Sequence, residues 1–197
     1  TSGGSGSLNT GLTVNDDNAQ HNFLLTYDPN YNSGNGAILF WLDSNPVQIL
    51  NLSSGHKTQG VNVDRFGLAN IEADGDTMEI YFDDLEYKSG AIDIADPFDS
   101  DPVWAINTTI TTGVCANIAP NFGFSNTNHA GGSIGEMGGI VQRSEKGEFY
   151  GKDVNDNMSS TLSASGRVRL KNSTRIEGSN VGVFFGWFNS EKQGWRP

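Results

Sequence analysis

The sequence contains little cysteine, little positive charge and no long apolar run. Cys115 is the only cysteine, so no disulfide can form within the chain and the hydrophobic core alone must hold the fold. Lys and Arg number 12 against 23 Asp and Glu, and the resulting net charge of −11 would repel nucleic-acid phosphates and anionic lipid surfaces. No apolar stretch approaches the roughly 20 residues of a membrane span. We therefore expect neither nucleic acid as a partner nor insertion into a membrane.

Metal-binding side chains of the soft kind are also scarce. One cysteine and three histidines cannot build the usual four-ligand zinc site unless carboxylates join them. Asp96, Asp99 and Asp101 lie at close spacing among Pro and Ser residues, and such hard oxygen ligands are suited to Ca²⁺. The segment lacks the glycine and glutamate of an EF-hand loop. Two predictions therefore stand for this segment: a calcium site or a solvated acidic connection.

The chain is rich in Gly, Ser, Thr and Asn, whereas charged residues make up only 18% of it. This composition favours turns and strands over helices. A length of 197 residues suits one compact domain. Residues 1–12 are Gly- and Ser-rich and predict a flexible linker or tag remnant, without the basic and apolar stretches of a signal peptide. Residues 13–197 are expected to form a single domain.

Apolar periodicity and turn residues predict about eight to twelve short strands, which is typical of a β-sandwich or jelly roll. Residues 88–102 (KSGAIDIADPFDSDP) are small and acidic and predict a long connection. The fold class is therefore all-β, a two-sheet antiparallel sandwich. The expected strands cover residues 21–27, 37–42, 47–52, 64–71, 78–83, 105–114, 134–141, 166–171 and 181–188.

Two of these strands indicate which side chains face the core. Ile80 and Phe82 alternate with polar neighbours, as expected for a sheet with one wet face. Val168 and Leu170 are predicted to face inward between charged residues. Residues 37–42 are apolar on both faces, which favours a central place in a sheet and a core position for Trp41.

The first half of the chain resembles a known superfamily. The run HNFLLTYDPNYNSGNGAILFWLDS, beginning at His21, looks like part of the concanavalin-A-like lectin/glucanase superfamily, which includes laminin-G-like modules. The segment DRFGLANIEADGDTMEIYFDDLEY, beginning at Asp64, is similar to the closing strand region of such modules. The resemblance covers roughly residues 20 to 87. It implies a jelly-roll sandwich, an extracellular or cell-surface location and glycan binding.

The second half resembles the opening half of large bacterial extracellular sandwich modules. It includes NFGFSNTNHAGGSIGEMGGIVQRSEKGEFYG, then LSASGRVRL, and then VGVFFGWFNSEKQGWR. Segments that would close such a module therefore come first, so the order looks circularly permuted. A fragment of two tandem repeats and strand exchange between copies are the alternatives.

A glucanase of that superfamily would need two carboxylates about 5 Å apart for retaining hydrolysis. The expected Glu-x-Asp-x-Glu pattern is missing. Glu79 and Asp83 share a spacing of four residues, which in a strand separates them by roughly 13 Å. Asp83 and Asp84 are expected to be an exposed strand end, with side chains on opposite faces.

The stretch from Asn128 to Arg143 is the first candidate site. Its glycines let a backbone approach a ligand closely, while Asn128, His129, Glu136, Gln142 and Arg143 offer hydrogen-bonding groups. His129 and Glu136 are the candidates for acid–base chemistry. The structural alternative is that the glycines mark bulges and turns, with Glu136 paired to Arg143.

The second candidate site lies near the C-terminus, where Trp187, Asn189, Trp195 and Arg196 are close in sequence. Sugars stack on aromatic rings, and amide and guanidinium groups bind their hydroxyls. The alternative for Trp187 is a core position continuing the side of Val183 and Phe185.

Carbohydrate binding by a module of a larger secreted or surface protein is the leading functional hypothesis, with polysaccharide or glycan as the partner. A structural subunit of an extracellular fibre or surface layer, assembled from copies of itself by strand exchange, is the first alternative. A polysaccharide-cleaving enzyme is the second, and the missing carboxylate pair makes it the less favoured one.

Overall fold

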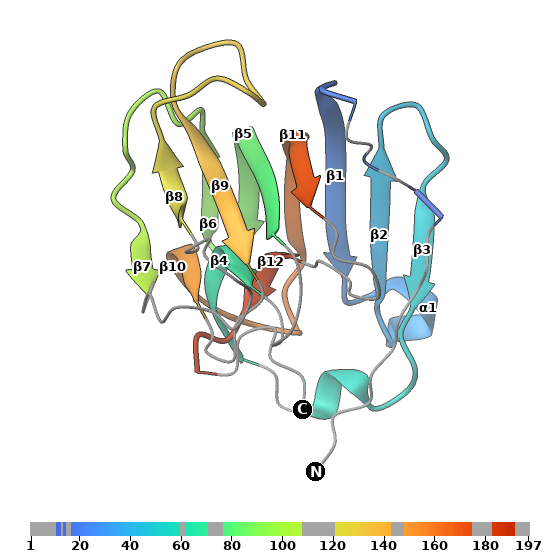
Figure 1. Cartoon of the computed structure of the whole chain (residues 1–197). Coiled ribbons are helices and arrows are strands. Elements are labelled where there is room, and N and C mark those ends of the chain that lie inside the picture. The colour runs from blue at the N-terminus through green and yellow to red at the C-terminus, as the bar shows by residue number, and fades with distance from the viewer. Residues whose placement is uncertain are drawn as a thin grey trace.

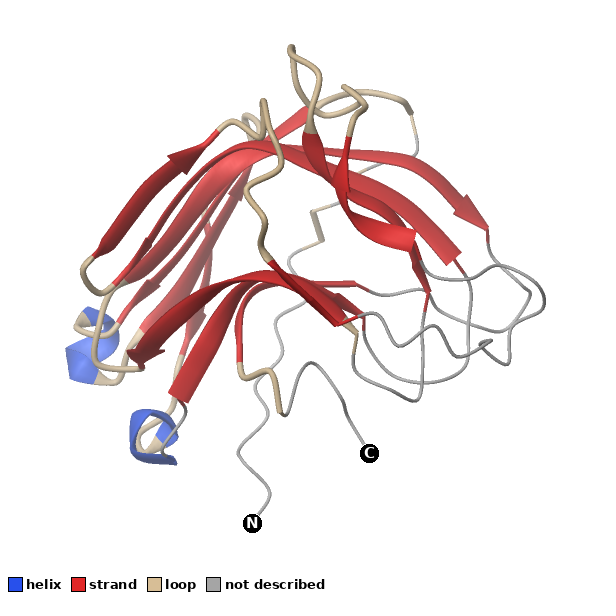
Figure 2. Ribbon diagram, turned by 90° about the vertical axis from the view of Figure 1, so that its left-hand side faces the viewer, coloured by secondary structure: helices blue, strands red, loops and turns tan. Residues whose placement is uncertain are grey.

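The computed structural model of the chain describes residues 11, 12, 14, 17–59, 62–70, 77–107, 121–142, 148–174 and 183–191. Two antiparallel sheets pack face to face, and the larger one curves over the smaller one (Figure 2). The predicted all-β class and two-sheet antiparallel sandwich are confirmed.

The larger sheet has the order β3-β2-β1-β11-β5-β9-β8, and β6 pairs with the second half of β5 (Figure 1). Its strands are β1 (His21–Asp28), β2 (Ala37–Leu42), β3 (Gln48–Asn51), β5 (Thr77–Ser89), β6 (Ile92–Asp96), β8 (Asn121–Ser125), β9 (Glu136–Gln142) and β11 (Leu162–Thr174). The smaller sheet has the order β12-β4-β10-β7, with strands β4 (Asn62–Asn70), β7 (Ala105–Asn107), β10 (Phe149–Asn157) and β12 (Val183–Phe188). Both sheets thus combine strands from the first and second halves of the sequence.

Helical structure among the described residues is limited to two single turns. The α1 turn (Tyr31–Gly34) occupies the predicted hairpin connection, where Asn32 and Ser33 have φ values of 50° and 56°. The second turn, η1 (His56–Gln59), follows β3. Within the described residues, no helix has the length and apolar character needed to cross a membrane.

The centre of the larger sheet is the long pairing of β5 with β11, and its inward side chains follow the predicted alternation. Ile80, Phe82, Val168 and Leu170 are all buried in the main core, as the sequence predicts. The alternation breaks at Asp84, which has a φ of 50° at a register shift between the two strands. Such a bulge bends a strand and changes where its side chains point.

Aromatic rings join the two sheets. Phe82 of the larger sheet stacks on Phe185 of the smaller one, with ring centroids 4.3 Å apart. Phe66 and Tyr87 make the corresponding contact at 4.4 Å. Contacts of this kind add stability beyond the burial of their area, which suits a fold that contains no internal disulfide.

Three expectations about the elements need correction. The predicted connection 88–102 contains β6, because Ile92 and Ile94 alternate with smaller or polar residues and pack on the core. β2 is apolar on both faces but lies second from the sheet edge. Strands β8 and β10 were not predicted. Asn107 is the last described residue of the expected strand 105–114, and the remainder of that strand, with Cys115, lies outside the described residues.

Candidate functional site

The glycine-rich stretch predicted as the first site forms a loop, residues 126–135, on the outer face of the larger sheet. The outer face is the one turned away from the smaller sheet. Glu136 has no exposed surface, and its carboxylate accepts hydrogen bonds from Thr127 Oγ1 and from the backbone N–H groups of His129 and Ala130. Since both oxygens are engaged, Glu136 holds the loop in place. Arg143, the structural partner predicted for Glu136, lies outside the described residues.

His129 lies on the outer face beside Tyr81, with ring centroids 4.5 Å apart. Its Nε2 is 3.4 Å from Lys171 Nζ, and its carbonyl accepts hydrogen bonds from Arg169 and Gln20. Asn128 is exposed beside it. Glu136 accepts a hydrogen bond from the backbone N–H of His129, whereas the ring of His129 packs on Tyr81.

Asp83 lies beneath the same loop, which corrects the expectation of an exposed strand end. Its side chain is 1% exposed, and a Cβ added to Gly131 would lie 1.4 Å from its Oδ2. Burial raises the pKa of Asp83 to about 6, with the nearby Asp84 and Glu136 adding to the shift. The expectation that Asp83 and Asp84 point to opposite faces also fails, since the bulge turns Asp84 toward Arg167 on the outer face.

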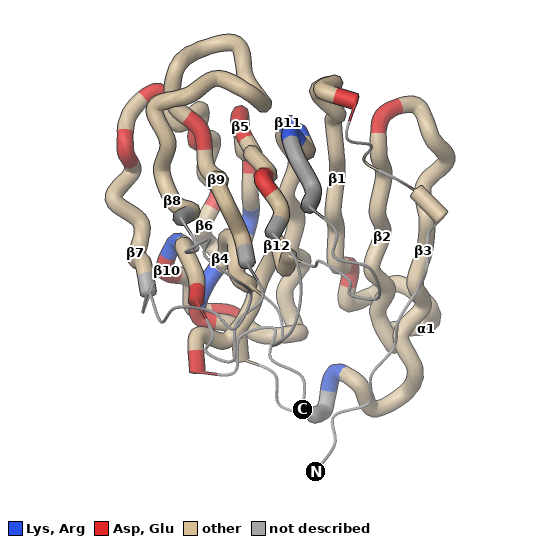
Figure 3. Tube along the Cα trace, in the orientation of Figure 1, with Lys and Arg blue, Asp and Glu red and all other residues tan. Residues whose placement is uncertain are grey.

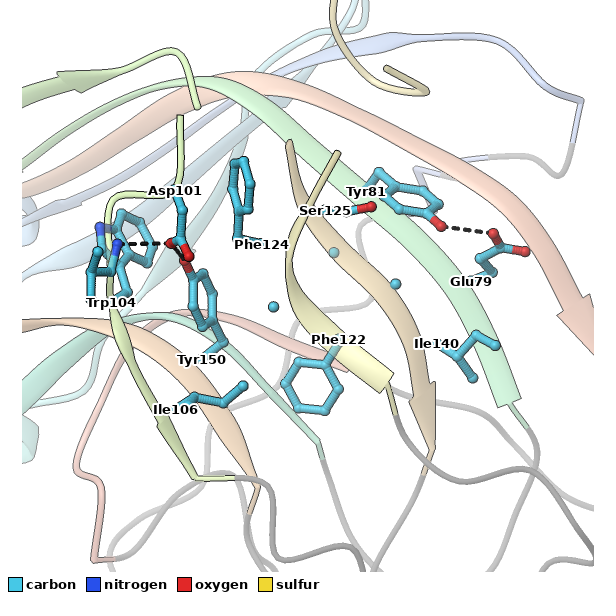
Figure 4. Close-up of a pocket in the computed structure, with 14 residues that line it drawn as sticks. Glu79, Tyr81, Asp101, Trp104, Ile106, Phe122, Phe124, Ser125, Ile140 and Tyr150 are labelled. Carbon is cyan, nitrogen blue, oxygen red and sulfur yellow. Dashed lines mark hydrogen bonds between the residues drawn. The ribbon is translucent and has the colours of Figure 1, made fainter. Parts of the chain in front are cut away.

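A pocket of about 500 Å³ lies where the edge of the larger sheet meets β7, and we call it the edge pocket (Figure 4). It is lined by Glu79, Tyr81, Asp101, Val103, Trp104, Ile106, Phe122, Gly123, Phe124, Ser125, Gly138, Gly139, Ile140 and Tyr150. Figure 4 shows Trp104 and Tyr150 on one side of the β8 and β9 ribbons and Tyr81 on the other. The pocket therefore extends around the sheet edge.

Glycines shape the edge pocket. Gly138 of β9 pairs with Gly123 of β8 on one side and with Tyr81 of β5 on the other. A Cβ at Gly138 would lie 2.1 Å from the carbonyl oxygen of Ile80, so only glycine fits this backbone. With no side chains at these positions, a ligand could approach the backbone of two strands.

Two carboxylates face the edge pocket from opposite sides. Burial alone would raise the pKa of Glu79, but hydrogen bonds from Lys171 and Tyr81 hold it below its usual value. Asp101 is exposed, and its Oδ1 accepts hydrogen bonds from the Val103 N–H and from the Tyr150 hydroxyl, at 2.8 Å and 3.4 Å. The lowered pKa keeps Glu79 a hydrogen-bond acceptor at neutral pH.

Aromatic rings pack against one another on one side of the edge pocket. Trp104 and Tyr150 stack with ring centroids 5.6 Å apart, and both are almost fully buried. Burial and the nearby Asp101 raise the pKa of Tyr150, so its hydroxyl stays protonated. Ile106, by contrast, is 57% exposed at the rim. Such a pocket can offer fixed acceptors and apolar surface to a ligand.

The second predicted site is only partly described. Trp187 packs on Phe66, with ring centroids 4.9 Å apart, on the inner side of β12 together with Val183 and Phe185, as the core alternative expects. Asn189 donates to the carbonyl of Asn62 and accepts from Glu191 N. These two residues do not line one cleft. Arg143, Trp195 and Arg196 lie outside the described residues, as does the side chain of Gln142.

Two of the three aspartates considered for calcium accept hydrogen bonds from nearby backbone N–H groups. Asp96 Oδ1 accepts the N–H of Phe98 and Asp101 Oδ1 that of Val103, each closing a local turn, while Asp99 is exposed. Within the described residues, no three His, Cys, Asp or Glu side chains are grouped to hold a metal ion. A calcium site at these three aspartates therefore stays a prediction, without a cluster of ligands among the described residues to support it.

Trp41 differs from its expected core position. It is half-buried and lines a shallow groove on the outer face with Leu24, which is 42% exposed. The ion pair of Arg167 with Asp84 forms the opposite side of this groove. It is a second, flatter surface where a ligand could lie.

Sequence reasoning placed only two residues of the edge pocket, both glycines, in a candidate site. Gly138 and Gly139 belong to the predicted stretch, whereas Tyr81, Trp104 and Ile106 were not proposed as site residues and Asp101 was proposed only for calcium. These residues come from separate strands and loops, and no local pattern brings them together. Comparison of the chain with protein-family models, with curated proteins and with solved structures finds no match.

Proposed function

We propose that this chain is an extracellular carbohydrate-binding module that holds a glycan in the edge pocket. The observation that carries the proposal is that apolar side chains, the exposed Ile106 among them, and hydroxyl-binding acceptors line one concave site of about 500 Å³. That volume lies within the usual range of small-molecule sites. Sugars present apolar faces and hydroxyl donors together, and the edge pocket offers matching groups.

The charges around the pocket favour a neutral glycan. Asp101 and Glu79 line it, and the side chain that neutralises Glu79, Lys171, is already engaged. Figure 3 shows acidic residues along the connection from β6 to β7 and on β5 and β9. A net charge of −11 adds to this field. Acidic and sulfated polysaccharides would therefore be repelled.

A binding role explains the pocket better than catalysis. Glu136 is fully buried and holds the loop, so it is not positioned to exchange protons with a substrate. Glu79 and Asp101 approach the pocket from different sheet faces and are not arranged as the close pair of a retaining hydrolase. Formation of reducing ends or unsaturated sugars by the wild-type protein would contradict this argument.

One observation supports the alternative that the chain is a structural subunit of a fibre or surface layer. The terminal strands β3 and β8 of the larger sheet each pair on one side only among the described strands. An open edge can accept a strand from another copy. Light scattering at rising protein concentration distinguishes the alternatives, because a fibre subunit grows into larger particles and a monomeric binding module does not.

The glycan proposal is tested by affinity electrophoresis through gels containing neutral, acidic or sulfated polysaccharide, with and without a chelator. Ile106→Arg places a bulky charged side chain at the pocket rim, and Ile134→Arg makes the same change at a 65% exposed residue outside the pocket. We expect one neutral polysaccharide to retard the wild type and Ile134→Arg, and Ile106→Arg to migrate freely.

Equal retardation of both arginine variants would refute the edge pocket as the site. Loss of retardation in Trp41→Ala would then place binding on the outer-face groove, and loss in Trp195→Ala would place it near the C-terminus. Free migration of the wild type in every gel would favour the structural subunit. Retardation that disappears with the chelator would support the calcium prediction at Asp96, Asp99 and Asp101.

A further inference from the structure

Three side-chain hydroxyl groups line the edge pocket, those of Tyr81, Ser125 and Tyr150. A hydroxyl has one proton to donate and two lone pairs that accept, so the group that receives the proton decides what the hydroxyl can offer to a ligand. Where a neighbouring protein group takes the proton, only the acceptor function is left for the ligand.

The proton of Ser125 is fixed by a short chain of hydrogen bonds that ends at Glu136. The Thr127 hydroxyl donates to Glu136 Oε1, a carboxylate oxygen that also accepts the backbone N–H of His129. Thr127 has no second hydroxyl proton, and its Oγ1 lies 2.7 Å from Ser125 Oγ. Ser125 must therefore be the donor in this contact. Toward the edge pocket, which this half-buried serine lines, its oxygen can only accept.

The Tyr81 hydroxyl is bound in the same sense. It donates to Glu79 Oε1 at 2.8 Å, and Lys171 Nζ donates to the same oxygen at 2.9 Å. Neither of these hydrogen bonds reaches Oε2 of Glu79, and 21% of the Glu79 side chain is exposed. Glu79 is therefore open to a ligand as an acceptor.

Tyr150 and Asp101 repeat this arrangement on the other side of the β8 and β9 ribbons (Figure 4). The Tyr150 hydroxyl accepts the backbone N–H of Trp104 and donates to Asp101 Oδ1, 3.4 Å away. Asp101 itself is exposed. Acceptors that a ligand can reach thus lie on both sides of the sheet edge, whereas no hydroxyl group of the described lining keeps a free proton.

We propose that the edge pocket binds its glycan through the glycan's own hydroxyl protons, with Ser125 Oγ as one of the acceptors, and so selects sugars whose hydroxyl groups are unsubstituted. This inference rests on the proposed glycan binding and names the chemical class that the pocket accepts. Because the acceptors are spread over both sides of the sheet edge, the ligand needs several separate donors, which a polyhydroxylated chain supplies and a single amine does not. A methyl ether keeps the sugar oxygen but has no proton, so it would leave an acceptor of the pocket unpaired.

The test is affinity electrophoresis in gels containing dextran, pullulan, galactomannan or arabinoxylan, each as the free polysaccharide and as its O-methylated derivative. We expect at least one free polysaccharide to retard the wild type, and its methylated derivative to bind at least tenfold more weakly. No retardation by any free polysaccharide would refute the proposed glycan binding itself, and this inference with it. Equal affinity for the free and methylated forms would leave glycan binding in place and overturn this inference alone.

Two variants test the role of Ser125. Ser125→Ala should weaken binding of the free polysaccharide about three- to tenfold, which is the effect of one neutral hydrogen bond. Its matched control is Ser163→Ala, at a half-buried serine on β11 outside the edge pocket, which should bind as the wild type does. Thr127→Val keeps the shape of the side chain but releases the Ser125 proton, which can then be donated to a methylated oxygen. The ratio of the free to the methylated affinity should therefore fall at least threefold.

A purely structural role for Thr127 would weaken binding of both forms by the same factor and leave their ratio unchanged. Either that result or unchanged binding in Ser125→Ala would overturn the assignment of Ser125. The serine variant leaves the contact between Thr127 and Glu136 in place, so a folding defect in Thr127→Val does not remove the test.

Discussion

Glu148 is a buried carboxyl group whose cost should appear directly in the stability of the protein. Its side chain is 0% exposed, and neither carboxylate oxygen has a hydrogen-bond partner within the described residues. Its backbone is fixed by two hydrogen bonds with Asn70, at 2.9 Å and 3.1 Å, immediately before β10. Within the described part of the chain, no group hydrogen-bonds this side chain or stabilises its charge.

Burial raises the pKa of Glu148 from 4.5 to about 7. The carboxyl is neutral in both the folded and unfolded states below pH 4.5, so it then costs little. Above pH 4.5 the unfolded state ionises first, and stability is lost progressively until the pH passes the folded pKa near 7. A difference of about 2.5 pH units corresponds to a loss of about 3 kcal/mol.

The variant Glu148→Gln keeps the size of the side chain and cannot ionise. We expect it to match the wild type near pH 4 and to be more stable by about 3 kcal/mol at pH 8. With a urea m-value of about 2 kcal/mol/M, the unfolding midpoint should rise by about 1.5 M. Tryptophan fluorescence follows the unfolding between pH 4 and pH 8.

The matched control is Glu86→Gln, because Glu86 is an exposed glutamate on β5. Its stability difference from the wild type should stay within about 0.5 kcal/mol at every pH. A difference between Glu148→Gln and the wild type that does not change with pH would refute the reasoning. It would mean that Glu148 is hydrated or paired in solution.

Two further predictions concern the outer face. Gly131→Ala should lower the unfolding free energy by about 1–3 kcal/mol, because its Cβ would overlap Asp83, whereas Gly132→Ala should have little effect, since no atom lies within 4 Å of its Cβ. Equal urea midpoints for the two variants would contradict this loop packing. Lys171→Met should raise the pKa of Glu79, because it removes the cation and hydrogen bond that oppose burial. NMR titration of the Glu79 carboxyl measures the change, and an unaltered pKa would contradict the assigned contact.

Local alternation was sufficient to predict most strands, since it reports one buried face directly. Val168 and Leu170 alternate with charged residues, and both are buried as expected. Strand β10 has the sequence FYGKDVNDN, in which Val154 and the buried Asp156 share a face. Because the aspartate is polar, the pattern did not indicate a strand.

The site could be predicted much less well, because its residues meet through long-range pairing. Tyr81, Gly138 and Gly123 lie side by side only after β5, β9 and β8 pair in register. Asp83 alternates with apolar residues, as a side chain on a solvent-exposed sheet face would. It is nevertheless buried, because a loop more than 40 residues later in the chain covers it. Local patterns contain no information on such coverage.

The unequal width of the two sheets accounts for two pockets of the sandwich. Among the described strands, eight belong to the larger sheet and four to the smaller, so the smaller sheet faces only part of the larger one (Figure 2). At one margin of the larger sheet β7 ends beside β8, and the edge pocket opens there. At the other margin β12 lies opposite β1 and β2, and a second pocket, lined by Leu25, Ile38 and Trp187 among others, lies between them. The two pockets differ in chemistry, because carboxylates line the edge pocket, whereas the described side chains that line the second pocket are uncharged. Separate substitutions at the two margins can therefore test each pocket on its own.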